Sequence, residues 1–150
     1  MDLKLEVVVV PVSDVDRAKE FYRRLGFRED IDFTRDDGYR VVQLTPPGSA
    51  CSIIFGKGVT TAPAGSLDRL LLAVSSVDAA RDALHAKGVA VSVFHDAGGG
   101  LGGGFVAEPA GRAAGPDPQG RSYATYASFS DPDGNRWLLQ EITERLPGRV

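Results

Sequence analysis

The stretch VSDVDRA at residues 12–18 decides the fold, because it recurs as VSSVDAA at residues 74–80. The two copies share Val, Ser, Val, Asp and Ala at the same offsets. Each copy follows an apolar run and leads through a helical pattern to a glycine, Gly26 in the first copy and Gly88 in the second. A repeat of this period indicates one supersecondary unit that is used twice, with each copy completing the core of the other.

Each copy has the pattern of a strand followed by a capped helix. Residues 3–12 are rich in Val and almost continuously apolar, which predicts a strand covered on both faces. Ser13 and Ser75 are the expected helix N-caps, with Asp16 and Asp78 three residues further on in a capping-box arrangement. Apolar residues then recur at helical spacing along one face of each segment.

Strands and turns account for most of the remaining chain. The expected strands are residues 27–33, 39–44, 51–55, 70–74, 89–94, 123–130 and 136–142, with turn sequences at 36–38 and 131–135. Each copy therefore has the order βαβββ. We predict an α+β fold in one domain, residues 1–150, made of two paired modules, residues 3–56 and 67–143. A Gly/Pro-rich loop is expected at residues 96–120.

The totals exclude several classes of protein. A chain of 150 residues suits one domain, and its net charge of −3 argues against nucleic acid or an anionic membrane as a partner. The single cysteine, Cys51, allows no internal disulfide and fits a reducing compartment. There is no apolar run of membrane-spanning length and no signal-peptide pattern. We expect a cytoplasmic protein that binds neither nucleic acid nor membrane.

Two βαβββ modules side by side form a curved mixed sheet around a trough, and troughs of this kind hold small molecules. Strand alternation predicts which side chains face the trough, while Trp137 and Leu139 pack under the helices. The predicted ligand-binding residues are Val7, Val9, Arg69, Leu71, Tyr126, Arg136, Leu138 and Gln140, with His95 at the rim and Phe105 as a lid residue after the glycine run.

Three of the polar candidates have alternative roles. A buried Arg69 needs an anionic partner, which is either a ligand carboxylate or phosphate or a protein acid such as Asp68. His95 would need an orienting partner to act as a base. Tyr123 and Tyr126 lie on opposite faces of one predicted strand, so at most one of them faces the trough.

Several motifs carry a family resemblance: Val12-Ser13-Asp14-Val15, Phe21-Tyr22, Leu25-Gly26-Phe27 and Asp131-Pro132-Asp133-Gly134-Asn135. At this spacing they resemble the vicinal oxygen chelate superfamily, which includes glyoxalase I, bleomycin-resistance proteins and extradiol dioxygenases. The resemblance covers nearly the whole chain. It implies the paired βαβββ fold and, in many members, a homodimer.

The resemblance also implies where a divalent metal would be held. Enzymes of the superfamily take two strand ligands from each module, and the corresponding places here are Val7, Arg69, Leu138 and a position within residues 50–55 that offers Cys51 or Ser52. Hard and borderline cations need carboxylate or imidazole donors. We therefore predict that the usual metal site is absent and that the protein has no cofactor.

Three functions remain open. The first is a metal-free, glyoxalase/bleomycin-resistance-like protein that binds a small aromatic or anionic molecule. The second is a lyase or dioxygenase of the superfamily with a displaced metal site at Glu6, Glu141 or His95, although alternation directs both glutamates to the opposite sheet face. The third is an oligomerising domain without a ligand. Pairing of the modules within one chain and between the chains of a homodimer are both open.

Overall fold

Each copy of the repeated stretch forms a helix in the computed structural model, which describes residues 1–99 and 109–149. Helix α1 spans Val15–Arg24 and helix α2 spans Val77–Ala86. Their N-caps are Asp14 and Ser76, one residue later than predicted, and each side chain accepts a hydrogen bond from a backbone N–H of the first turn. The prediction of Ser13 and Ser75 as caps is therefore wrong.

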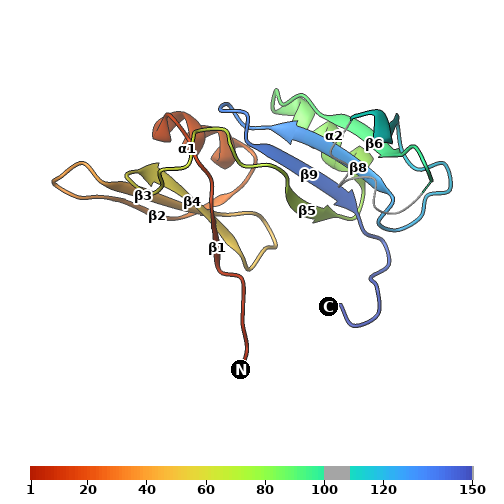
Figure 1. Ribbon diagram of the computed structural model, residues 1–150, viewed down its shortest axis with the longest axis horizontal. Coiled ribbons are helices and arrows are strands. Elements are labelled where there is room, and N and C mark those ends of the chain that lie inside the picture. The colour runs from red at the N-terminus through yellow and green to blue at the C-terminus, as the bar shows by residue number, and fades with distance from the viewer. Residues whose placement is uncertain (100–108, 150) are drawn as a thin grey trace. The chain divides into compact units, whose positions relative to one another are not determined.

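The chain divides into two units, each with one helix and one mixed sheet, which confirms the α+β class (Figure 1). Unit 1 comprises Met1–Asp68 and Ser130–Asn135, and unit 2 comprises Arg69–Phe129 and Arg136–Val150. The predicted modules, residues 3–56 and 67–143, do not coincide with these units. The turn at residues 130–135 belongs to unit 1, although the strands that it joins belong to unit 2.

Unit 1 contains a four-stranded sheet in the order β1-β4-β3-β2. The strands are β1 (Val7–Val9), β2 (Arg28–Thr34), β3 (Arg40–Thr45) and β4 (Ser52–Lys57). Strand β1 runs parallel to β4 and the other pairs are antiparallel. Val42 pairs with Phe55 and Leu44 with Ile53, and all four are buried. Strand alternation therefore places these four on one face, which is the face that packs against Tyr22 of α1.

The other face of this sheet is open within unit 1. Val7, Val9, Ile31 and Phe33 lie on it, and their exposed fractions run from 36% to 52%. The prediction of a strand over residues 3–12 covered on both faces is therefore wrong. The strand has three residues, and α1 covers only one side of the sheet to which it belongs.

The turn at residues 130–135 is fixed to unit 1 by the side chain of Asn135, which is fully buried. Its Nδ2 donates to the carbonyl oxygen of Pro11 at 2.7 Å and to Asp131 at 2.8 Å, and its Oδ1 accepts from the N–H of Leu67 at 3.0 Å. The hydroxyl of Tyr22 donates to Asp131 at 2.7 Å. Each polar atom of this buried network thus has a partner.

A second contact of the turn explains why Ser13 does not cap α1. The Ser13 hydroxyl donates to Oδ1 of Asp133, and its backbone N–H donates to Oδ2 of the same carboxylate at 3.2 Å. Arg17 lies 3.2 Å from that carboxylate as well. Ser13 therefore binds the turn, and the cap falls to Asp14.

Unit 2 contains a five-stranded sheet in the order β5-β9-β8-β6-β7. The strands are β5 (Leu70–Val74), β6 (Ser92–Asp96), β7 (Arg112–Ala114), β8 (Thr125–Ser130) and β9 (Arg136–Glu141), and a short 3₁₀ helix, η2, covers Pro109–Gly111. Strand β7 and η2 lie within the segment predicted as a loop at residues 96–120, so that loop is interrupted by regular structure. No helix of residues 1–99 and 109–149 has the length and apolarity needed to cross a membrane.

One face of the unit 2 sheet packs against α2. On this face the rings of Phe129 and Trp137 stack against each other with centroids 6.0 Å apart, and both residues are buried. At the end of β9, the carboxylate of Glu141 accepts a hydrogen bond from the N–H of Val77, in the first turn of α2, at 2.9 Å. Trp137 and Leu139 therefore lie on the helix side, as predicted.

The segment before β8 is held by an ion pair between Asp117 and Arg121, whose side chains are 3.0 Å apart. The Arg121 guanidinium also donates to the carbonyl oxygen of Gly99 at 2.9 Å. Hydrogen bonds from Arg121 are the main cause that lowers the pKa of Asp117 to about 2.

Asn135→Ala should destabilise the protein by about 3 kcal/mol, because it leaves Pro11, Leu67 and Asp131 without their buried partner. Tyr22→Phe removes one bond of the same network and should cost about 1 kcal/mol. Urea unfolding followed by circular dichroism measures both. Gln119→Ala, at an exposed position, is the control and should stay within about 0.5 kcal/mol of wild type. An Asn135→Ala variant as stable as this control would contradict the assigned role.

The Asp117 pKa predicts a loss of stability in acid. Its folded value of about 2 lies below the usual 3.8, so the ion pair stabilises the fold above about pH 4 and is lost as the pH falls through about 2. Thermal unfolding between these pH values should show a shallower dependence in Asp117→Asn and in Arg121→Gln than in wild type. Equal slopes in all three proteins would contradict the assignment.

Candidate functional site

The candidate site is the face of the unit 2 sheet that lies away from α2. The register pairs Leu71 with Leu138, Ala73 with Gln140, and Phe94 with Tyr126. Because side chains alternate along a strand, these residues lie on the face opposite to Trp137 and Glu141. The predicted lining residues Leu71, Tyr126, Leu138 and Gln140 are thus brought together on one face of one unit.

An aromatic pair with a cation on it forms the centre of this face. The rings of Phe94 and Tyr126 are stacked with centroids 5.6 Å apart and planes 13° apart, and both pack with Leu138 in one buried cluster. The guanidinium carbon of Arg112 lies 4.2 Å from the centroid of the Phe94 ring. A cation in this position is attracted by the negative face of the ring.

Polar contacts fix the amide next to this pair. Nε2 of Gln140 donates to the Tyr126 hydroxyl oxygen at 2.9 Å and to the carbonyl oxygen of Tyr123 at 3.0 Å. Gln140 is 5% exposed. The face therefore combines an apolar floor with a cation and an oriented amide, which is the composition typical of small-molecule sites.

The remaining predicted residues of unit 2 differ in their positions. His95 pairs with Thr125 and alternates with Phe94, which puts it on the other face, and its Nδ1 lies 2.8 Å from the carbonyl oxygen of Gly115. Arg69 precedes β5 with a left-handed backbone, φ +64°. Arg136 is an exposed residue at the start of β9, and because it lies two residues before Leu138 it is on the same face as Leu138. Phe105 lies outside the described residues.

Val7 and Val9, the other two predicted residues, belong to the open face of unit 1. The parallel register places Val7 beside Ser52. Ser52 begins a hydrogen-bonded row on this face: its hydroxyl lies 2.7 Å from that of Thr45, and Thr45 in turn donates to Asp30. The hydrogen bond from Thr45 is the first cause that lowers the pKa of Asp30, and Arg28 is the second. One end of this open face is therefore polar and the rest is largely apolar.

The chemistry of the family's metal-ligand places does not suit a metal ion. Val7 and Leu138 are hydrocarbon side chains without donor atoms, and Arg69 is a cation. Of the displaced ligands considered, Glu141 lies on the helix side, where it accepts from the backbone of α2. Among residues 1–99 and 109–149, no three His, Cys, Asp or Glu side chains gather into a possible metal site. Val7, Arg69 and Leu138 therefore offer no side-chain donor that suits a divalent metal.

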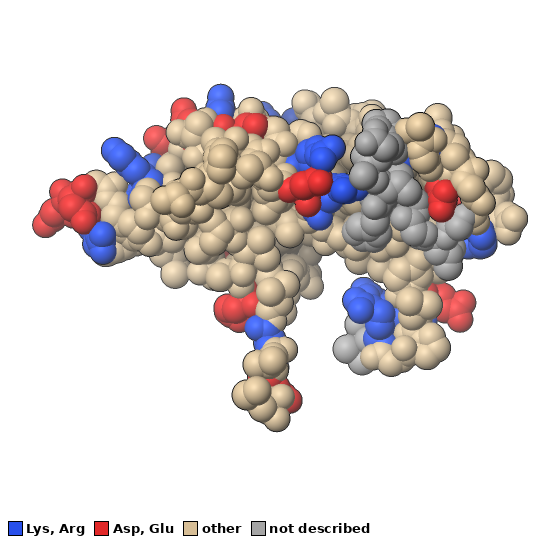
Figure 2. Space-filling model, in the orientation of Figure 1, with Lys and Arg blue, Asp and Glu red and all other residues tan. Residues whose placement is uncertain are grey.

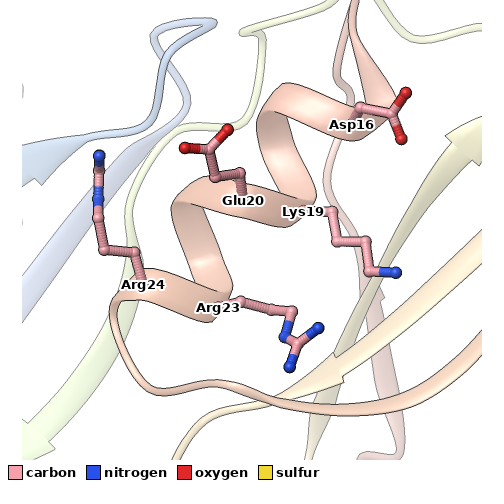
Figure 3. Close-up of a pocket in the computed structure, with 5 residues that line it drawn as sticks. All are labelled: Asp16, Lys19, Glu20, Arg23 and Arg24. Atoms are coloured by element: carbon pink, nitrogen blue, oxygen red, sulfur yellow. The ribbon is translucent and has the colours of Figure 1, made fainter.

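An open hollow on unit 1 is not a comparable candidate. It is lined by Asp16, Lys19, Glu20, Arg23 and Arg24, which all project from α1 (Figure 3). Lys19 is already paired with Glu29 at 2.6 Å and with Asp32 at 2.7 Å. These carboxylates raise the pKa of Lys19, and hydrogen bonds from Arg40 and Lys19 hold the pKa of Asp32 well below its usual range. The hollow is therefore part of a charged surface.

Sequence reasoning missed Arg112, because the residue lies in a segment expected to be a loop. The alternating pattern that reveals a strand needs about four residues, and β7 has three between stretches rich in glycine and proline. Pairing with β6, which no local pattern encodes, places Arg112 near Phe94. The role of Tyr123 was also missed, since it acts through its backbone carbonyl.

The chain was compared with known proteins. The family model described as the Glyoxalase/Bleomycin resistance protein/Dioxygenase superfamily matches residues 4–139. No curated protein matches the sequence. Among solved structures, TnmS3, an antibiotic binding protein from Streptomyces sp. CB03234, is 32% identical, with a TM-score of 0.66 and coverage of 93% of this chain and 95% of its own.

Two further structures have the same fold. A glyoxalase/bleomycin resistance protein from Streptomyces sp. CB03234 is 33% identical, with a TM-score of 0.64 and coverage of 91% of this chain and 99% of its own. A superfamily member from Sphaerobacter thermophilus DSM 20745 is 25% identical, with a TM-score of 0.60 and coverage of 93% and 97%. Since the family model spans residues 4–139, the chain belongs to the glyoxalase/bleomycin resistance protein/dioxygenase superfamily.

Proposed function

We propose that the protein binds a small planar aromatic molecule, in particular an aromatic anion, on the face of the unit 2 sheet that lies away from α2, without a metal. The observation that carries this proposal is the stack of Arg112 on Phe94 and of Phe94 on Tyr126. A planar guanidinium stacks on aromatic rings and pairs with carboxylates. Arg112 can therefore bind both the ring and the anionic group of such a ligand.

The buried apolar side chains around Arg112 strengthen its interactions with other charges. Phe94, Tyr126 and Leu138 are at most 5% exposed, so the guanidinium lies against apolar side chains on one side. Charge interactions are stronger next to such a low-dielectric surface than in open water. An anionic ring that reaches Arg112 therefore gains both stacking and charge pairing.

The comparison with TnmS3 supports binding over turnover. That protein is an antibiotic binding protein, and it is 32% identical over almost the whole length of both chains. Binding that sequesters a small molecule needs no acid, base or metal at the site. It agrees with a face that offers an aromatic pair, a cation and an amide.

The proposal retains the setting predicted from the sequence, namely a cytoplasmic homodimer with neither nucleic acid nor membrane as a partner. Acidic and basic side chains are interspersed over the face drawn in Figure 2, without an extended basic patch. The net charge of −3 also argues against nucleic acid, which needs a basic face.

Arg112→Ala should weaken binding of 2-naphthoate about tenfold, because it removes both the charge and the stacking plane. Arg112→Lys keeps the charge without the plane and should fall between wild type and the Ala variant. Isothermal titration calorimetry measures the three affinities. Arg145→Ala, an exposed position in the same unit, is the matched control and should bind as wild type does. Equal affinity in the Arg112→Ala variant, or no binding to wild type at millimolar 2-naphthoate, would overturn the proposal.

Metal analysis tests the second part of the proposal. Protein purified without chelator should contain far less than one equivalent of Zn, Ni, Mn or Fe, and EDTA should leave its affinity for 2-naphthoate unchanged. The physical reason is the lack of donor atoms on Val7 and Leu138. A stoichiometric metal that is lost in Glu141→Gln would instead support a displaced metal site.

A further inference from the structure

We propose that Gln140 presents its amide oxygen to the ligand, so that the bound aromatic molecule carries a neutral hydroxyl or N–H donor. This inference rests on the proposed function, because it names the ligand class for the same sheet face. It follows from the orientation of one amide, which can be derived from the hydrogen-bonding capacity of its neighbours.

The carbonyl oxygen of Tyr123 determines which way the amide of Gln140 points. A carbonyl oxygen only accepts hydrogen bonds, so the atom that lies 3.0 Å from it must be the amide nitrogen. The second hydrogen of that nitrogen goes to the Tyr126 hydroxyl oxygen at 2.9 Å. Both donors of Gln140 are therefore used inside the protein, and its amide oxygen is left as the acceptor.

The backbone of Tyr123 holds this orientation in place. Tyr123 has φ +71°, in the left-handed region that residues other than glycine rarely adopt. Its N–H donates to the carbonyl oxygen of Glu141 at 2.8 Å, and its hydroxyl oxygen accepts from the N–H of Leu146 at 3.1 Å. These contacts fix the unusual conformation at both ends of the residue, and the conformation directs the carbonyl toward Gln140.

The amide oxygen lies on the sheet face that carries the proposed site. Gln140 pairs with Ala73 and lies two residues from Leu138, so its side chain emerges beside the Phe94–Tyr126 pair. An acceptor at this place favours a ligand group with a hydrogen to donate. The charge of Arg112 on the same aromatic pair disfavours an ammonium group, which leaves a neutral hydroxyl or N–H.

The test compares two ligands that differ only in the donor hydrogen, 2-naphthol and 2-methoxynaphthalene. Wild-type protein should bind 2-naphthol about fivefold more tightly, which is the contribution of one hydrogen bond. In Gln140→Met, which keeps the length of the side chain without the amide, the two affinities should become equal. Gln119→Met, at an exposed position of unit 2, should keep the fivefold preference. Fluorescence titration measures each affinity.

A measurement on wild-type protein covers the case in which Gln140→Met fails to fold. The side-chain amide signal of Gln140 in ¹⁵N-labelled protein, identified by its proximity to Tyr126, should shift with 2-naphthol and not with 2-methoxynaphthalene. An equal shift with both ligands, or equal affinities in wild type, would overturn the donor requirement.

The two proposals can fail separately. If Arg112→Ala weakens 2-naphthoate while wild type binds both naphthalenes equally, the site stands and the role of Gln140 is wrong. If wild type binds none of the three compounds at millimolar concentration, both proposals are wrong.

Discussion

The structure depends on the burial of a single side-chain amide, that of Asn135. Burying a polar group without partners costs several kcal/mol, so the surrounding chain must supply each of them. Pro11, Leu67 and Asp131 do so, and they come from three separate parts of the sequence. This one group therefore fixes three segments: the chain before α1 at Pro11, the chain before β5 at Leu67, and the turn at residues 130–135.

The same turn makes the two copies of the repeat unequal. In the first copy, Asp133 binds Ser13, and the N-cap falls to Asp14. In the second copy, Ser76 is the cap and the carboxylate of Glu141 binds the first turn of α2. The duplicated sequence thus builds the same strand-helix pattern twice with different polar partners.

Most of the fold could be predicted from local patterns. The run at residues 70–74 and the turn at 131–135 have strong strand and turn signals, and the structure places them as expected. The caps were misplaced by one residue, because Ser13 has a partner 120 residues away that no local rule contains. The short strand β7 was missed for a similar reason, since its register comes from pairing with β6. Long-range partners therefore account for the main differences.

The candidate site shows the same limit. Alternation along predicted strands grouped Leu71, Leu138 and Gln140 on one face, and it left open which of Tyr123 and Tyr126 shares that face. It also separated them from Trp137 and Leu139. It gave no information about Arg112. His95 was expected at the trough rim because it ends a strand, and its alternation with Phe94 puts it on the other face. Strand periodicity predicts a face, whereas the cation on that face requires the tertiary pairing.

The assignment of the turn at residues 130–135 to unit 1 has a consequence for how the chain is made. During synthesis, residues 1–68 emerge first, but the partners of Pro11 and Tyr22 are only translated with the last part of the chain. The first copy of the repeat therefore cannot complete its buried hydrogen bonds as it leaves the ribosome. The buried polar contacts of the first copy thus depend on residues that lie more than one hundred positions further along the chain.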